Sequence, residues 1–292
     1  MDRYICIHGH FYQPPRENPW LEAIELQDSA APYHDWNERI TRECYAPNSV
    51  SRILDGQGRI AKLVNNYAKI SFDFGPTLLS WLEVKGPDAY AAILAADRQS
   101  RELFSGHGSA LAQVYNHLIM PLANSRDRAT QIRWGIGDFK HRFGRAPEGM
   151  WLAETAVDVE TLEDLAGSGI RFTILAPHQA ARIRRLGDPA WQEINGDQIN
   201  TTLAYRQRLP SGRTIAIFFT TARSPVQWPS RDCCPTASIS STVWSAPSPP
   251  TEPGRSSSTS PPTENPTATI TASATWRSPT SWTRSRRASW RT

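Results

Sequence analysis

The chain has 292 residues, with 32 Lys and Arg against 28 Asp and Glu. The basic excess comes from the last 73 residues, which hold 8 Arg and 3 acidic residues, so residues 1–219 carry 24 basic and 25 acidic side chains. That balance gives no case for a nucleic-acid-binding protein, and no apolar run approaches the 18 residues or so of a membrane-spanning helix.

Cysteine usage also limits the class of protein. Cys6 and Cys44 are the cysteines before the tail, and two isolated cysteines make neither a disulfide framework nor a zinc pattern. No signal peptide precedes the first strand-like run. We therefore expect a soluble, cytoplasmic protein with no cofactor and no bound metal. The oligomeric state is not indicated.

The first half of the chain predicts alternating strands and helices. In chain order we expect a buried strand at 4–8, a loop at 9–20, a helix at 20–27 and irregular structure at 28–47. The spacing of Ile53, Leu54, Ile60, Leu63 and Val64 then predicts an amphipathic helix over 49–66. A strand at 69–74 follows, with a break at Gly75-Pro76 and a helix over 77–84.

The second half continues the alternation. We expect a helix at Pro87–Leu103, a strand at 103–108, a helix at 126–143, a strand at 149–152, a helix at 159–168 and a strand at 170–176. Residues 203–208 and Thr214–Phe219 predict a hairpin with its turn at Pro210-Ser211-Gly212. Alternating strands and helices indicate a parallel α/β fold, and polar residues past several strand ends suggest a β/α barrel rim.

The first polar cluster, at the end of the first strand, is His8-Gly9-His10 with Gln13. Two histidines at i and i+2 point to the same side of a strand, toward one pocket. They suit hydrogen bonding to sugar hydroxyls, a metal pair, or a structural loop. The metal reading lacks an acidic third ligand at motif spacing. Asp73, at the end of the second expected strand, belongs to the same rim.

The second cluster is Gly106-His107-Gly108, at the end of the expected third strand. Glycines beside a histidine permit the backbone to approach a ligand closely, although the segment could equally be a flexible turn. Asn116 and His117 lie nearby in sequence, and we expect His117 inside a helix with a structural role.

The third and strongest pattern is Gly149–Thr155, in which Trp151 and Glu154 come at a strand end. Trp151 could stack on a sugar ring, and Glu154 could attack an anomeric carbon or stabilise an oxocarbenium ion. A surface glutamate after a core strand is the alternative. Aromatic residues in the first half could also be carbohydrate platforms, although most such residues belong to a core: Trp20, Tyr33, Trp36, Tyr45 and Trp81.

These three blocks, in this order, resemble the motifs of glycoside hydrolase family 57, in its α-amylase/α-mannosidase-like subgroup. The resemblance covers residues 1–219 and implies a (β/α)7 barrel of the glycoside hydrolase/deacetylase type, retention of anomeric configuration, no metal, and α-glucan substrates. By motif, Glu154 would be the nucleophile, with His8, His10, Gln13, Asp73, His107 and Trp151 at the sugar site. Ala153 departs from the proline common before the nucleophile.

The family's acid/base Asp has no counterpart in the sequence as written. Residues 220–292 hold 30 Ser or Thr, 11 Pro and 5 Trp, and no Leu, Lys, Phe, Tyr or His. Disordered tails are poor in Trp, so this composition indicates out-of-frame translation after Phe219. A permitted reading of the shifted frame restores Asp-Gly-Glu-x-x-Gly-His, with the Asp codon straddling Pro262 and Thr263.

We therefore expect an incomplete barrel over 1–219, a disordered low-complexity tail over 220–292, and a retaining glycosidase or 4-α-glucanotransferase that is inactive as written. Two alternatives stay open. One is a metal-dependent polysaccharide deacetylase-like hydrolase, and the other is a carbohydrate-binding pseudoenzyme.

Overall fold

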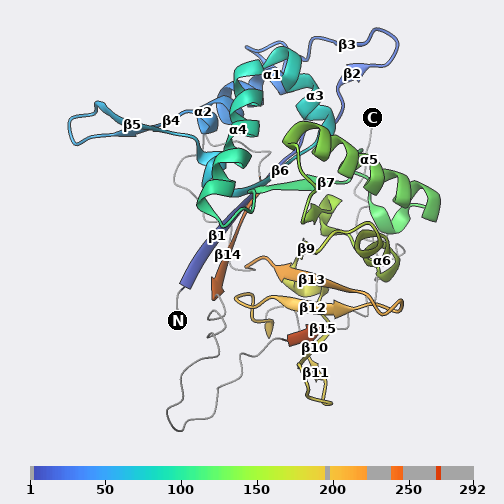
Figure 1. Cartoon of the computed structure of the whole chain (residues 1–292). Helices are drawn as coiled ribbons and strands as arrows, with labels where there is room; N and C mark the ends of the chain where they lie inside the picture. The colour runs from blue at the N-terminus through green and yellow to red at the C-terminus, as the bar shows by residue number, and fades with distance from the viewer. Residues whose placement is uncertain (1–2, 195–197, 222–237, 246–267, 271–292) are drawn as a thin grey trace, which may run out of the picture.

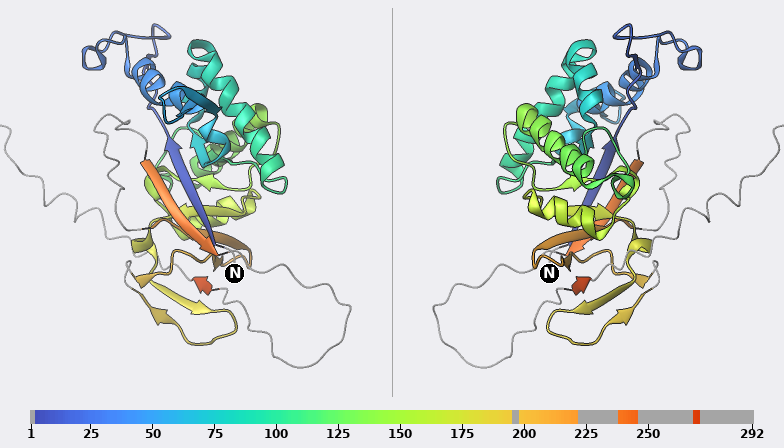
Figure 2. Two further views of the ribbon diagram at one scale, coloured as in Figure 1. Left: turned by 90° about the vertical axis from the view of Figure 1, so that its left-hand side faces the viewer. Right: turned by 90° about the vertical axis from the view of Figure 1, so that its right-hand side faces the viewer.

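The computed structural model describes residues 3–194, 198–221, 238–245 and 268–270. Within these residues six strands run parallel as one curved sheet, and the helices gather on one side of it (Figures 1 and 2). In sheet order they are β1 (Arg3–Phe11), β6 (Ser71–Phe74), β7 (Ala110–Gln113), β8 (Met150–Trp151), β9 (Phe172–Leu175) and β13 (Thr214–Phe219). A single bridge between Gly149 and Phe172 joins β8 to β9. The predicted α/β class with an incomplete barrel is confirmed.

The remaining elements flank this sheet. The helices are α1 (Trp36–Ile40), α2 (Ala46–Ser49), α3 (Pro76–Lys85), α4 (Pro87–Leu103), α5 (Ser125–Phe143) and α6 (Val159–Gly167). The short helical turns are η1 (Asp28–Ala30), η2 (Thr41–Tyr45), η3 (Asn66–Ala68), η4 (Met120–Leu122), η5 (Ala153–Thr155) and η6 (Pro177–Gln179). The other strands are β2 (Glu17–Asn18), β3 (Ala23–Ile24), β4 (Ser51–Leu54), β5 (Ile60–Val64), β10 (Arg182–Arg185), β11 (Gln192–Glu193), β12 (Tyr205–Arg208), β14 (Ser238–Ser245) and β15 (Ala268–Ile270).

The elements with clear start and stop signals are confirmed. Prolines at the first positions of α3 and α4 suit the helix start, where no intrahelical donor is lost. Asn124 caps α5 by accepting from the Asp127 N–H, and Asp158 caps α6 by accepting from the Thr161 N–H. The predicted hairpin of β12 and β13 forms in antiparallel register.

The helix predicted over 49–66 is wrong, because these residues form the β4–β5 hairpin that projects from the body in Figure 1. Asp55 explains the turn: its Oδ1 accepts from the N–H groups of Gln57 and Arg59, both at 2.9 Å, and Gly58 adopts φ +75. The apolar residues that suggested a helix face are exposed instead: Ile53, Leu54, Ile60 and Leu63.

Two further predictions in the first fifty residues are wrong. Residues 20–27 contain β3, paired with β2, and not a helix, because Asn18 Oδ1 accepts from the Trp20 N–H and forms a turn. Residues 28–47 are not irregular, since helical structure runs from Trp36 through η2 to α2. Asp35 starts it by accepting from the Glu38 N–H at 3.0 Å.

The third strand also lies elsewhere than predicted. The helix α4 runs to Leu103, and a turn through Gly106, at φ +87, leads into β7 at Ala110–Gln113. All four residues of β7 are buried. This shift of several residues decides which side chains follow the carboxyl end of the strand.

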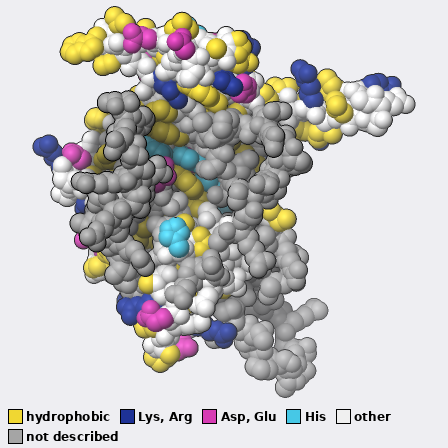
Figure 3. Space-filling model, turned by 180° about the vertical axis from the view of Figure 1, so that it is seen from behind, with side chains coloured by type: hydrophobic (Ala, Val, Ile, Leu, Met, Phe, Trp, Pro, Cys, Tyr) yellow, Lys and Arg dark blue, Asp and Glu magenta, His cyan; other side chains and the backbone are white. Residues whose placement is uncertain are grey.

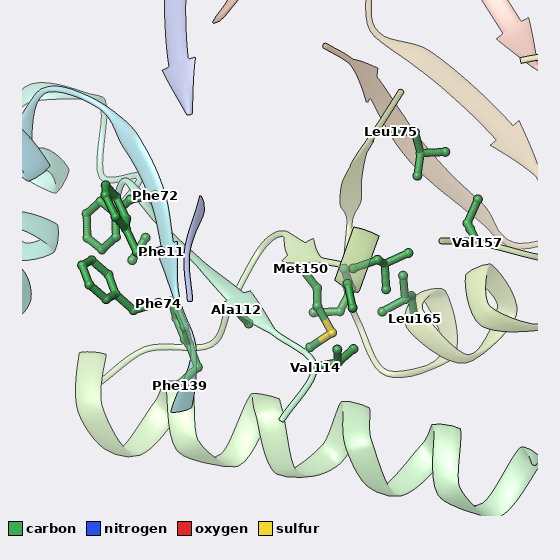
Figure 4. Packing of buried hydrophobic residues seen from close by; sticks show 14 of the residues in the cluster. Phe11, Phe72, Phe74, Ala112, Val114, Phe139, Met150, Val157, Leu165 and Leu175 are labelled. Carbon is green, nitrogen blue, oxygen red and sulfur yellow. The ribbon is translucent and has the colours of Figure 1, made fainter. Parts of the chain in front are cut away.

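The hydrophobic core lies between the sheet and its helices. Figure 4 shows Phe11, Phe72 and Phe74 grouped on one side of β7, with Met150, Val157, Leu165 and Leu175 on the other. The rings of Phe11 and Phe74 stack with centroids 4.7 Å apart. This core fixes the adjacent ends of β1 and β6, from which the polar site projects.

The helix α5 packs unusually close to β7. A Cβ atom at Gly135 would lie 2.2 Å from the carbonyl oxygen of Gln113, so only glycine allows this approach. Beyond the strand, Gln131 of α5 accepts through Oε1 from the Asn116 N–H at 2.7 Å. The loop that follows β7 is therefore held by α5.

Two segments of the predicted tail are described, and both are strands, β14 and β15. The strand β14 pairs antiparallel with β1, from His10↔Ser238 to Arg3↔Ser245, and β15 lies between β10 and β12. The rest of the predicted tail, including the position of the restored Asp codon, lies outside the described residues.

Candidate active site

The site begins with three polar side chains on two adjacent strands. His8 and His10 of β1 lie beside Ser71 and Asp73 of β6 in parallel register. Asp73 accepts from both histidines: Oδ1 lies 3.0 Å from His8 Nε2 and Oδ2 lies 2.8 Å from His10 Nδ1. The structure therefore brings His8, His10 and Asp73 together, as the i, i+2 spacing predicted.

The charges in this cluster follow from burial and pairing. Burial alone would raise the pKa of Asp73, but the charge of His10 and hydrogen bonds from both histidines outweigh it and hold the pKa below its ordinary value. Burial would lower the pKa of His10, yet the attraction of Asp73, with a contribution from Glu154, raises it. The cluster is thus built as a carboxylate beside a readily protonated His10.

Trp151 packs against both of these histidines. Its ring stacks on His8 and on His10, with centroids 4.9 Å away in each case. The residue is only 5% exposed. The sequence suggested that Trp151 stacks on a sugar, but its ring packs against the imidazoles and its place is to position them.

Glu154 follows β8 and is exposed at the carboxyl end of the sheet. Glu154 and Thr155 both adopt φ +54, a left-handed conformation that costs a non-glycine residue about 1–2 kcal/mol. The Thr155 N–H donates to Leu152 O at 3.0 Å, and Gln179 Nε2 donates to Thr155 O at 2.7 Å. These bonds hold Glu154 at a strained position, as is common at functional sites.

His117 joins the cluster, although the sequence assigned it to a helix. Its Nε2 lies 3.2 Å from His10 Nε2, and its ring stacks on Tyr12 with centroids 3.8 Å apart. Burial, and then the charge of His10, lower the pKa of His117 to about 4, against the attraction of Asp73. A neutral His117 can therefore accept the proton that a cationic His10 presents.

The correct position of β7 would have identified His117 as a site residue. With the strand at Ala110–Gln113, His117 falls four residues past its end, as Glu154 falls three past the end of β8. His117 also adopts φ +54. In Figure 3 histidine side chains are visible in a hollow of the molecule.

Gln113 is a second residue that the sequence did not single out. It ends β7 opposite Trp151 of β8 and is 2% exposed. Neither its Oε1 nor its Nε2 has a hydrogen-bond partner within the described residues, and the same holds for the Trp151 indole N–H. Buried polar groups of this kind are normally satisfied by water or ligand.

Two predicted site residues do not join this cluster. The Gln13 carboxamide accepts from Arg16 Nη2 at 2.7 Å and contacts the hydroxyl of Tyr45 at 3.5 Å, so it is engaged inside the fold. His107 lies before β7 and pairs with Glu148, which lies before β8, at 2.9 Å. His107 and Glu148 therefore lie at the amino-terminal edge of the parallel strands, opposite Glu154.

The glycines beside His107 have a structural purpose. A Cβ at Gly108 would lie 2.3 Å from Asp97 Oδ1 and 2.4 Å from Arg145 Nη2. Asp97 is 1% exposed and pairs with Arg145 at 2.7 Å, while its Oδ1 accepts from the Ala110 N–H. The close approach predicted for a ligand is thus made by an ion pair that anchors the start of β7.

Two other kinds of feature, a membrane-spanning helix and a metal site, are absent from the described residues. None of the described helices is long and apolar enough to cross a membrane. Over the same ranges, no group of three or more His, Cys, Asp or Glu side chains is arranged to hold a metal ion.

Comparison with known proteins finds similar sequences and structures. Over 107 residues the chain is 28% identical to Alpha-amylase 1 of Dictyoglomus thermophilum, which covers 36% of this chain and 15% of that protein. The 4-alpha-glucanotransferase of Thermococcus litoralis superposes with a TM-score of 0.48 at 17% identity, over 74% of this chain and 27% of that one. The alpha-amylase AmyC of Thermotoga maritima superposes with a TM-score of 0.46 at 15% identity, over 76% of this chain and 46% of that one.

This chain spans 15% of the length of the curated relative it matches. The profile of Glycosyl hydrolase family 57 matches residues 69–222, which include Asp73, His117 and Glu154. Because the match extends over more than half of the 292 residues, the chain belongs to Glycosyl hydrolase family 57.

Proposed function

We propose that the intact protein is a retaining glycoside hydrolase or 4-α-glucanotransferase that acts on α-glucans by double displacement, with Glu154 as nucleophile. The observation that carries this is the placement of Glu154. It is an exposed carboxylate held in a left-handed turn at the carboxyl end of β8, with its charge felt by His10. An α-amylase among its relatives supports α-glucan as the substrate class.

In the first step a carboxylate oxygen of Glu154 attacks the anomeric carbon. The bond from that carbon to the glycosidic oxygen breaks, and a second carboxyl group, roughly 5 Å from the first, gives the leaving oxygen its proton. Water or a sugar hydroxyl then displaces Glu154 and returns a proton to the second group. Hydrolysis and glycosyl transfer differ only in which of these acceptors enters.

The histidine cluster would bind the sugar next to the attacked carbon. A protonated His10 donates through Nδ1 to Asp73 and through Nε2 to His117, so the Nδ1–H of a neutral His117 is the donor left for a sugar hydroxyl. In this proposal His107 and Gln13 take no part in substrate binding.

The second carboxyl group is the acid/base Asp that the shifted reading frame restores. The composition changes after Phe219, and the family match ends at residue 222, three residues later. Without that Asp the chain as written lacks general acid–base help, which contributes about 10²–10⁴-fold. We therefore propose that the chain as written is inactive or barely active.

The test starts from the encoding DNA across codons 218–236. A missing base there would allow an in-frame repair, and three proteins would be compared on maltoheptaose: the chain as written, the repaired chain, and the repaired chain with Glu154→Gln. We expect turnover by the repaired chain alone, with a covalent glycosyl adduct on Glu154 when the second step is slowed.

Three outcomes would contradict the proposal. Turnover by the repaired chain that survives Glu154→Gln would remove the nucleophile assignment. An intact frame as written, with glucan bound and not turned over, would replace the enzyme by a carbohydrate-binding pseudoenzyme. Turnover that is lost on adding EDTA would favour the metal-dependent deacetylase-like alternative.

A further inference from the structure

A cavity of about 780 Å³ lies between α1 and α3, the helices in the upper part of Figure 1. It is separate from the carboxyl end of the parallel strands where Glu154 lies, which we call the catalytic edge. We call the cavity the α1–α3 cleft. One wall comes from α1 and η2 and the other from α3, and the β2–β3 turn and the start of α4 complete it. None of His8, His10, Asp73, Trp151 and Glu154 lines it. Its volume lies in the range of ligand sites.

The α3 wall presents an aromatic ring with nothing stacked on it. Trp81 is half-buried in this wall. No aromatic ring or arginine stacks on its ring among the residues that the structure describes, and no hydrogen bond engages its indole N–H there. By contrast, Trp36 on α1 carries the Arg39 guanidinium at 4.9 Å and donates to Ser29. Trp81 also packs partly against the hydrophobic core, and the part of it that lines the cleft is available for a ligand.

Charged side chains of both signs surround Trp81, and several of them lack hydrogen-bond and ion-pair partners within the described residues. Arg42, Lys85, Glu22 and Asp88 line the cleft, and none of these side chains has a hydrogen bond or ion pair within the described ranges. Thr41, which also lines it, is 8% exposed, and its Oγ1 has no partner there either. Charged groups normally stay unpaired only where water or a ligand can reach them.

The chemistry of the cleft selects among ligands. Further carboxylates of Glu17, Asp35 and Glu38 line it, so acidic groups outnumber basic ones and a phosphate or acidic sugar would be repelled. A neutral ligand with many hydroxyls suits the arrangement, because an aromatic face takes the C–H side of a sugar ring and charged groups of both signs bond its hydroxyls.

We propose that the α1–α3 cleft is a second carbohydrate-binding site, which takes an α-glucan oligosaccharide on Trp81 outside the catalytic edge. The choice of α-glucan rests on the proposed function. Such a site would hold a long glucan to the protein while the catalytic edge acts on another part of it. The two sites would then bind one polymer with a higher effective concentration than either alone.

The experiment uses the full chain with Glu154→Gln, so that no turnover occurs, and maltoheptaose as the probe in calorimetric titration. We expect two binding sites per chain. Trp81→Ala should remove one of them or weaken it about tenfold or more, equivalent to about 1.4 kcal/mol. Trp134→Ala, an exposed tryptophan on α5 that does not line the cleft, is the matched control and should change nothing.

Lys85→Ala guards against a folding artefact, because Lys85 is exposed and its loss cannot open the core. It should weaken the same site that Trp81→Ala removes. Binding that is unaffected by either substitution would overturn the proposal. Failure of the proposed function gives a result distinct from failure of the cleft proposal. In that case glucan binding would still depend on Trp81 but would not change with His10→Ala, because only the cleft would hold glucan.

Discussion

The Oδ2 atom of Asp73 lies 2.8 Å from Nδ1 of His10, in a pair that joins the neighbouring strands β1 and β6. Because Asp73 is fully buried, this pair sets the electrostatics of the candidate site.

The Asp73 pair predicts a stability difference that depends on pH in both directions. The lowered pKa of Asp73 contributes stability that is present above about pH 3.8 and is lost as the pH falls through the pKa of Asp73 in the folded protein. The raised pKa of His10 contributes stability that is present below about 6.5 and lost as pH rises through its folded value. Asp73→Asn should therefore cost most, about 3 kcal/mol, between these limits.

Urea unfolding of both proteins at pH 3, 5.5 and 9 would check this. The difference in unfolding free energy should shrink at pH 3 and at pH 9. A difference that is the same at all three pH values would show that Asp73 acts through packing alone.

The lowered pKa of His117 predicts a change of stability with pH that is opposite in sign to that of His10. Its pKa falls from 6.5 to about 4 in the folded protein, so between these values the unfolded chain binds a proton that the folded chain does not. Stability should therefore fall as pH drops from 6.5 to 4, and His117→Gln should reduce that fall. Unfolding at pH 7 and pH 5 measures it, with the exposed His178→Gln as control. Equal slopes in all three proteins would contradict the buried setting of His117.

The Asp97–Arg145 pair predicts a large effect far from the chemistry. Asp97→Ala leaves Arg145 and the start of β7 without their partner, and should destabilise the protein by about 3–5 kcal/mol. Gly108→Ala should be severe for the same reason, since its Cβ would collide with both charged groups. Glu102→Ala, exposed on the same helix, should change the unfolding free energy by less than about 0.5 kcal/mol. Comparable losses in all three would argue against a specific anchor.

Two glycines of α5 form a matched pair. Gly135→Ala places a methyl group 2.2 Å from the Gln113 carbonyl oxygen and should force α5 away from β7, with several kcal/mol lost. At Gly137 a Cβ would meet nothing within 4 Å, so Gly137→Ala should stabilise by about 1 kcal/mol through helix propensity. Thermal unfolding distinguishes the two, and a stabilising Gly135→Ala would contradict the close approach.

Because residues of the β4–β5 hairpin are exposed, charged substitutions there should hardly change the free energy of unfolding. On a buried helix face the same substitutions would be strongly destabilising. Ile53 and Leu63 are 51% and 58% exposed, so Ile53→Lys and Leu63→Lys should each change the unfolding free energy by less than about 0.5 kcal/mol. Ile93→Lys in the core, where the residue is fully buried, should instead prevent folding. A loss of several kcal/mol at Ile53 or Leu63 would mean that these residues pack against something.

The sequence predicted the parallel architecture and the groups His8, His10, Asp73 and Glu154, because buried strands and their polar ends follow a simple local pattern. It misplaced the hairpin of residues 51–64, where an Asp-Gly turn outweighed helical spacing. Moving one strand from 103–108 to Ala110–Gln113 exchanged His107 for His117 at the site. Such exchanges depend on tertiary packing against α5, which no local pattern contains.

The left-handed turn at Glu154 is stabilised entirely by nearby chain, through Leu152, Ala153 and Gln179. The geometry of the proposed nucleophile is thus encoded before the compositional break, independent of the proposed proton donor. An in-frame C-terminal fragment supplied as a separate polypeptide could then complement the chain as written, which would make the two halves a split enzyme.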